Sequence, residues 1–238
     1  PVNVRAVADY GYRFVGWKGV RGEEDFRSFD FLLKSDSPYH IQAIFEKYEH
    51  PLMGRIIVNE VSANNKKTGD WVELFNDSDE HVSLLGWVMT DGDHHEFAFP
   101  DVSIGPNDYL VVCQDTEKFR NTFPRAYNAV GGLSFGLHKR HETLCLFSAQ
   151  GASVDSITYD LPPTDSVFTL NLLVPQLDNA DPENWAIAPG VGSPNAANPY
   201  YLESNVRMSQ KRWIRIGFGA GLVLVCLLLM WLKKREVL

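Results

Sequence analysis

The sequence is poor in cysteine, with three among 238 residues, and none of them belongs to a CxxC pair. This spacing argues against a zinc site. Cys226 lies inside a long apolar run, whereas Cys113 and Cys145 lie in strand-like segments, where they are expected to be free, small apolar side chains. A disulfide between Cys113 and Cys145 stays open as an alternative, because it needs Cα atoms within about 7 Å of each other.

The sequence also lacks two common catalytic motifs, a phosphate-binding loop and a kinase loop. One G-x-S-x-G pattern, GLSFG at 132–136, is present, but it does not indicate a nucleophile without a strand before it and a helix after it. Serines near histidines do not by themselves make a triad, and nothing in the sequence indicates titratable groups that converge on a pocket. We therefore expect this chain to have no enzymatic activity and to need no cofactor.

Positive charge is scarce outside the C-terminal region. Residues 203–238 hold seven basic and two acidic residues, a net charge of +5, and the other 202 residues hold 15 basic and 28 acidic residues, a net charge of -13. A folded part this acidic repels phosphate backbones, so we expect no nucleic-acid partner. The basic residues of this region are expected to face lipid headgroups.

One long apolar run is present, at residues 216–232, and it carries no charge. Its 17 residues would span roughly 26 Å as a helix, close to the thickness of a bilayer core. We predict a single transmembrane helix at 214–232, a juxtamembrane stalk at 201–213, a cytoplasmic tail at 233–238 and an extracellular β-rich part, with the lipid bilayer as a partner. The predicted anchor residues are Trp213, Arg215, Trp231, Lys233, Lys234 and Arg235.

Residues 55–200 consist of short apolar runs separated by turn residues at intervals of roughly 8 to 12 residues. This cadence indicates a mostly β fold, either a sandwich or a barrel. One segment, 117–123, could form one or two helical turns. The predicted strands are RIIVNEV, DWVELFN, VSLLGWVMT, HEFAF, YLVVCQD, TLCLF, SVDSITY and SVFTLNLL.

Residues 1–48 form a separate β-rich module in this interpretation. Strand-like segments occupy 2–8, 11–17 and 39–46, and the charged stretch 21–30 is expected to be an exposed connection. Residues 49–54, with a proline and a glycine, are predicted to be a linker. The chain begins at Pro1 without an initiator Met or a signal-type apolar run, so we expect the natural protein to begin further upstream.

Residues 55–200 resemble the lamin-tail domain, an immunoglobulin-like β-sandwich. The order and spacing of four segments carry the resemblance: IIVNEVSA (56–63), DWVELFNDSDEHVSLLGW (70–87), FAFPDVSIGPNDYLVV (97–112) and NWAIAPGVGSPNAAN (184–198). The first 48 residues are similar to the C-terminal part of a divergent internalin-type bacterial repeat, through GYRFVGW and IQAIFE. The pair resembles the architecture that follows the CotH spore-coat-kinase-like domain, which implies a bacterial surface protein.

Several acidic segments are candidate sites. Asp91, Asp93, His94 and His95 are plausible metal ligands, but their spacing matches no EF-hand or HExxH pattern, so a solvated turn is the preferred interpretation. The segment 138–142 is expected to be a charged loop. The segment 76–80 could bind calcium through several oxygens, but its composition is that of an ordinary loop, which is the preferred interpretation. Glu60 and Glu73, placed among apolar residues, are expected to bond a neighbouring loop, with a cation site as the alternative.

The predicted function is a non-catalytic, membrane-anchored surface module for binding, adhesion or spacing. Its partner would be a protein or a surface polymer, bound through exposed loops at 64–69, 91–95 and 136–142. The alternative is the membrane-tethering tail of a secreted CotH-type phosphotransferase or hydrolase whose catalytic domain lies upstream. A weaker third hypothesis is a metal-dependent hydrolase that uses the turn at 91–95.

Overall fold

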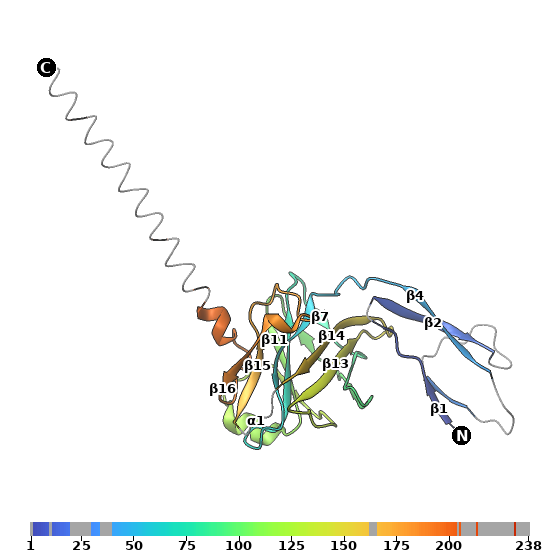
Figure 1. Cartoon of the computed structure of the whole chain (residues 1–238), viewed down its shortest axis with the longest axis horizontal. Helices are drawn as coiled ribbons and strands as arrows, with labels where there is room; N and C mark the ends of the chain where they lie inside the picture. The colour runs from blue at the N-terminus through green and yellow to red at the C-terminus, as the bar shows by residue number, and fades with distance from the viewer. Residues whose placement is uncertain are drawn as a thin grey trace. The chain divides into compact units, whose positions relative to one another are not determined.

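The computed structural model describes residues 2–9, 11–19, 30–33, 40–161, 166–203, 205, 213 and 231 (Figure 1). The chain forms two compact units, Pro1–Ala196 and Ala197–Leu238. The first unit is built almost entirely of strands, which confirms the predicted mostly β fold. In the second unit, residues 199–203, 205, 213 and 231 are helical.

A six-stranded sheet forms one layer of the sandwich. All neighbouring strands in it are antiparallel except β11 and β12. In spatial order its strands are β12 (Ala129–Gly131), β11 (Tyr109–Cys113), β6 (Trp71–Asn76), β5 (Ile56–Ser62), β15 (Phe168–Leu172) and β16 (Trp185–Pro189).

A four-stranded antiparallel sheet forms the other layer. Its order is β14 (Ser153–Asp160), β13 (His141–Phe147), β8 (Val88–Thr90) and β9 (Glu96–Ala98). In Figure 1 the labels β15 and β16 mark one layer, and β13 and β14 mark the other. Leu74 and Leu110 from the first sheet and Met89 and Leu146 from the second are fully buried in one apolar core. Burying the inner faces of two sheets against each other supplies most of the stability of a sandwich.

A bulge in β5 decides which side chains face the core. The register with β6 shifts between Val58 and Glu60, so Asn59 is an extra residue. The shift places Val58 and Val61 in the core cluster and leaves Glu60 opposite Glu73, on the outer face of the six-stranded sheet.

The outer face of this sheet is also covered, which is why every residue of β6 is buried. The helix α1 (Thr116–Thr122), capped by the side chain of Asp115, lies over part of it. Its seven residues agree with the one or two helical turns that the sequence allowed at 117–123. Phe119 of α1 packs edge-on against Trp71, with ring centres 6.0 Å apart, and both side chains are fully buried.

The N-terminal strands form two pairs. β1 (Val2–Arg5) pairs with β3 (Asp30–Leu33), and β2 (Tyr12–Lys18) pairs with β4 (Gln42–Lys47). Phe14 contacts the rings of Trp17 and Phe45 across the second pair. The predicted exposed connection at 21–30 is wrong at its end, because Asp30 begins β3.

Some strand predictions need correction. The run VSLLGWVMT is not one strand: it divides into β7 (Val82–Ser83) and β8 around a turn at Gly86, which has a φ of +77°. Strand β7 pairs with β10 (Ser103–Ile104), a strand that was not predicted, and β12 and β16 were not predicted either. Cys113 and Cys145 are both free, so the disulfide alternative is wrong; Cys113 is buried and Cys145 is half-buried.

The predicted membrane segment is mostly outside the described residues. Trp213 and Trp231 are described, with 70% and 49% of their surface exposed. Residues 214–230, with Arg215, and residues 232–238, with Lys233, Lys234 and Arg235, lie outside. Among the residues that the structure describes, no helix is long and apolar enough to cross a membrane.

A candidate binding surface at one end of the sandwich

Three loops predicted to be exposed lie together at one end of the sandwich. The loop 63–70 joins β5 to β6, the loop 91–95 joins β8 to β9, and the loop 136–140 leads into β13. Two buried carboxylates, Asp70 and Glu142, link them by accepting hydrogen bonds from their backbone N–H groups. We call the exposed residues of these three loops the three-loop surface.

Asp70 connects the first loop to the third. Its side chain is buried, with 7% of its surface exposed. The Oδ1 atom accepts a hydrogen bond from the backbone N–H of Asn65 at 3.1 Å, and Oδ2 accepts one from the N–H of Leu137 at 2.8 Å. Backbone donors stabilise a buried carboxylate without a basic partner, so Asp70 fixes both loops at once.

Glu142 connects the second loop to the third in the same way. It is 3% exposed, and its Oε1 accepts from the N–H of Gly92 at 3.2 Å and of Thr143 at 3.0 Å. Its Oε2 accepts from the N–H of His138 at 3.0 Å. The loop at 138–142 was expected to expose charges of both signs. Its only acidic residue, Glu142, is buried, so the charged side chains that it exposes are basic.

The four candidate metal ligands form a tight turn. Asp91 is buried, and its Oδ1 accepts from the N–H groups of Asp93 and His95. Its Oδ2 lies 2.7 Å from Nδ1 of His95, and this hydrogen bond raises the pKa of His95. Asp93, His94 and His95 are exposed. Within the described residues, no group of three or more His, Cys, Asp or Glu side chains is arranged to hold a metal ion.

A groove of about 640 Å³ opens beside the loops at 63–67 and 139–140 and the segment 166–168. Four basic side chains line it: Lys66, Lys67, Lys139 and Arg140. The Nζ of Lys139 donates to the carbonyl of Ser166 at 2.8 Å. Lys66, Lys67 and Arg140 form no ion pair with any residue that the structure describes. We call this feature the basic groove.

Sequence reasoning missed the basic groove because its parts are far apart in the chain. Lys66 and Lys67 precede β6, whereas Lys139 and Arg140 precede β13 in the opposite sheet. Two lysines or one Lys-Arg pair in a loop is ordinary surface composition. A smaller hollow of about 320 Å³ adjoins it, lined by residues 138–141 and Asp160.

A comparison with protein-family models finds one match, over residues 51–160. The matching family is the lamin tail domain. A search of curated proteins finds no match. The lamin tail match runs from just before β5 to the end of β14 and includes all three loops, which confirms the resemblance seen in the sequence for this part of the chain.

Two further carboxylates, Glu60 and Glu73, are fully buried on the outer face of the six-stranded sheet. Glu60 accepts hydrogen bonds from Oγ1 of Thr169 at 2.6 Å and from the N–H of Ser193 at 3.2 Å. Glu73 accepts from Nδ2 of Asn59 at 2.9 Å and from the N–H of Asn195 at 2.6 Å.

The environment of the glutamate pair favours its neutral form. Burial raises the pKa of both side chains, and the nearby charge of Glu60 raises the pKa of Glu73 further. The prediction that they bond a neighbouring loop is confirmed, since Ser193 and Asn195 belong to the loop that follows β16. The pair therefore fixes the end of the domain to its central strands.

The segment 76–80 begins at the end of β6 and lies at the opposite end of the sandwich from the three-loop surface. The side-chain Nδ2 of Asn76 donates to the carbonyls of Glu80, Ile104 and Gly105, and its Oδ1 accepts from the N–H of Ser78 at 3.0 Å. The amide of Asn76 thus fixes the loop internally. This bonding accounts for the polar composition that had suggested calcium.

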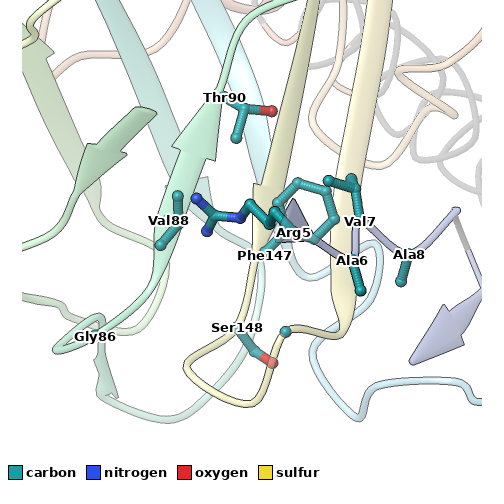
Figure 2. Close-up of a pocket in the computed structure, with 10 residues that line it drawn as sticks. Arg5, Ala6, Val7, Ala8, Gly86, Val88, Thr90, Phe147 and Ser148 are labelled. Carbon is teal, nitrogen blue, oxygen red and sulfur yellow. The ribbon is translucent and has the colours of Figure 1, made fainter. Parts of the chain in front are cut away.

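A small cavity of about 30 Å³ lies between the N-terminal segment and the four-stranded sheet. Figure 2 shows its lining, which includes Ala6, Val88 and Phe147. Arg5 beside it forms an ion pair with Glu96 of β9. The volume suits about one water molecule, so the cavity is too small for an organic ligand.

Proposed function

We propose that this chain is a non-catalytic, membrane-anchored surface module that binds a partner through the three-loop surface. The observation that carries the proposal is the pair of buried carboxylates, Asp70 and Glu142, which tie three loops from two sheets into one surface. Loops that are ordered before a partner arrives lose less conformational entropy on binding, so affinity rises. The partner would be a protein or a surface polymer.

The test compares the two ends of the sandwich. In one variant, the exposed residues Lys67, His94 and His138 of the three-loop surface are replaced together by alanine. In the control variant, the exposed residues Asp79, Glu80 and His81, in the loop that precedes β7, are replaced by alanine. The purified, labelled chains are then incubated with bacterial cell-envelope fractions, and the bound fraction is measured.

We expect binding by the unaltered chain and by the control, and a loss of at least about tenfold in affinity for the three-loop variant. Equal binding by all three chains, or binding by none of them, would reject the proposal. Thermal unfolding of each variant serves as the check on folding.

We further infer that residues 214–232 form a single membrane-spanning helix with the β-rich part outside the cell. The support is the uncharged stretch at 216–232, bordered by Trp213 and by Lys233. Removing residues 213–238 should move the chain from the membrane pellet to the supernatant. Protease treatment of intact cells should digest a tag on the β-rich part; a protected tag would reverse the orientation.

The alternative function is a membrane-tethering tail of a CotH-type phosphotransferase or hydrolase. The observation in its favour is the likeness of residues 1–48 to an internalin-type repeat, a module found downstream of such domains. The upstream part of the natural reading frame decides this, because it either encodes a catalytic domain or does not.

A further inference from the structure

We propose that the basic groove binds a short acidic peptide segment of a partner protein, one in which Asp or Glu residues alternate with apolar residues. The proposal rests on the proposed function, because two loops of the three-loop surface form the groove. It adds the chemical class of the ligand and the residues that recognise it.

The positive charge of the groove favours an acidic ligand. Lys66, Lys67 and Arg140 are exposed, line one groove and lack an ion-pair partner among the described residues. Cations in a concave surface attract an anionic ligand more strongly than the same cations on a convex surface, because field lines concentrate in the groove. Arginine adds a planar, bidentate donor that matches a carboxylate.

The apolar part of the groove lining favours a ligand that also carries apolar side chains. Val167 is 49% exposed, and Ala63 and Phe168 lie beside it in the groove. The Nζ of Lys139 lies 5.3 Å from the centre of the Phe168 ring, so its charge is held over an apolar wall. A ligand that carries only charges would leave this wall unused, whereas an acidic peptide with leucine or phenylalanine side chains would cover both kinds of surface.

The negative charge of the rest of the molecule favours a short ligand. Outside the C-terminal region the chain carries a net charge of -13, so the groove is a basic island on an acidic protein. A long polyanion would extend past the groove over a protein whose net charge repels it. A short acidic segment confines its charge to the groove and avoids that repulsion.

The test uses the full-length purified chain and four fluorescent or competing probes. The first is a short peptide in which Asp and Glu alternate with Leu and Phe. The second has Lys at every acidic position, the third has Ser at every apolar position, and the fourth is inorganic polyphosphate. Binding is followed by fluorescence anisotropy at two salt concentrations.

Two double variants are compared, one in the groove and one control outside it. Lys66→Glu with Arg140→Glu removes the net positive charge of the groove, because two of its four basic side chains become acidic. Lys47→Glu with Arg125→Glu makes the same change in net charge at exposed residues outside the groove lining. Because none of these four side chains forms a hydrogen bond or ion pair with a described residue, both variants should keep the thermal unfolding midpoint of the parent chain.

We expect the first peptide to bind the parent chain. Its affinity should fall by at least about tenfold in the groove variant, and by a similar factor for the parent chain at the higher salt concentration. In the control variant its affinity should change by less than about twofold. The peptide with lysines should not bind, and the peptide with serines should bind more weakly than the first. Equal affinity in the two double variants would reject the groove as the site. Polyphosphate that binds as tightly as the peptide would reject the peptide class.

The two proposals fail in different ways. If the chain binds cell-envelope fractions through the three-loop surface but none of these probes, the module binds a partner of another class, and only the present inference is rejected. If it binds neither, the proposed function fails as well.

Discussion

The side chain of Asp155 joins the two sheets of the sandwich by accepting a hydrogen bond from the backbone N–H of Val58 at 2.7 Å. Asp155 belongs to β14 and Val58 to β5. Strand β15 pairs with β5 only at Glu60 and Val61, so the backbone of Val58 needs another partner. Nδ2 of Asn179 completes the arrangement, donating to Oδ2 of Asp155 at 2.8 Å and to the carbonyl of Val58 at 3.3 Å.

The first prediction concerns the pH dependence of this contact. Burial raises the pKa of Asp155 from 3.8 to about 6. Between these values the unfolded chain releases its proton before the folded chain does, so the free energy of unfolding falls as the pH rises. The shift corresponds to a loss on the order of 3 kcal/mol between pH 4 and pH 7.

Urea unfolding of the chain and of Asp155→Asn at several pH values checks this prediction. Asparagine keeps an acceptor for Val58 but does not titrate, so the fall in stability between pH 4 and pH 7 should be smaller in the variant. Asp93→Asn, at an exposed position, is the control and should follow the parent chain. Parallel pH profiles for the parent and Asp155→Asn would show that Asp155 is charged in the folded state at pH 4.

The second prediction concerns the buried tryptophan of β6. Trp71 has no exposed surface and contacts the rings of Phe119 and Phe123, with centres 6.0 and 6.1 Å away. Trp71→Ala should lower the free energy of unfolding by roughly 3 to 5 kcal/mol, because it leaves a cavity under α1. Trp71→Phe should cost less, since the indole Nε1 has no hydrogen-bond partner among the residues that the structure describes. A cost below about 1 kcal/mol for alanine, measured in urea, would contradict this packing.

The third prediction uses two glycines of the closing loop. Gly192 and Gly190 have φ values of +103° and +109°, so alanine at either position carries backbone strain. A Cβ on Gly192 would also lie 2.5 Å from Cζ2 of Trp71 and 2.8 Å from Oε1 of Glu60, whereas a Cβ on Gly190 would meet nothing within 4 Å. Gly192→Ala should therefore be less stable than Gly190→Ala by about 1 to 3 kcal/mol in thermal or urea unfolding. Equal losses would mean that the loop moves away from Trp71 without cost.

The fourth prediction concerns the boundary of the folded domain. The family match ends at residue 160, before β15, β16 and the loop that carries Ser193 and Asn195. A fragment of residues 51–160 would expose one side of β5 and leave Glu60 and Glu73 without these donors. We expect this fragment to unfold without a cooperative transition in urea and a fragment of residues 51–196 to unfold cooperatively. Equal midpoints for the two fragments would show that β15 and β16 are dispensable.

Strand positions could be predicted from the sequence wherever apolar alternation was strong. The strands β5, β6, β11, β13 and β14 were all predicted, because each contributes several residues to one face of the core. Strands β10 and β12 were missed because they have only two and three residues. Strand β16 was missed because its sequence, WAIAP, lies in a stretch rich in Asn, Pro and Gly, which is typical of loops.

The role of the buried acids could be predicted only in part. The position of Glu73 among Trp71 and Phe75 showed that its carboxylate needed a partner, but Asn195 lies more than a hundred residues away and is not visible in any local pattern. The inward direction of Glu142 was equally hidden, so the charge of its loop was misjudged. Local sequence identifies a buried acid, whereas tertiary contacts decide what it bonds.

Both thiols of the sandwich are free, and burial raises the pKa of Cys113 and of Cys145. A reducing agent therefore breaks no covalent link in this domain, and an oxidant meets few reactive thiolates. The sandwich should fold to the same stability in glutathione-rich cytosol as in air-saturated buffer. Folding of the sandwich should therefore not depend on the redox state of the compartment that contains it.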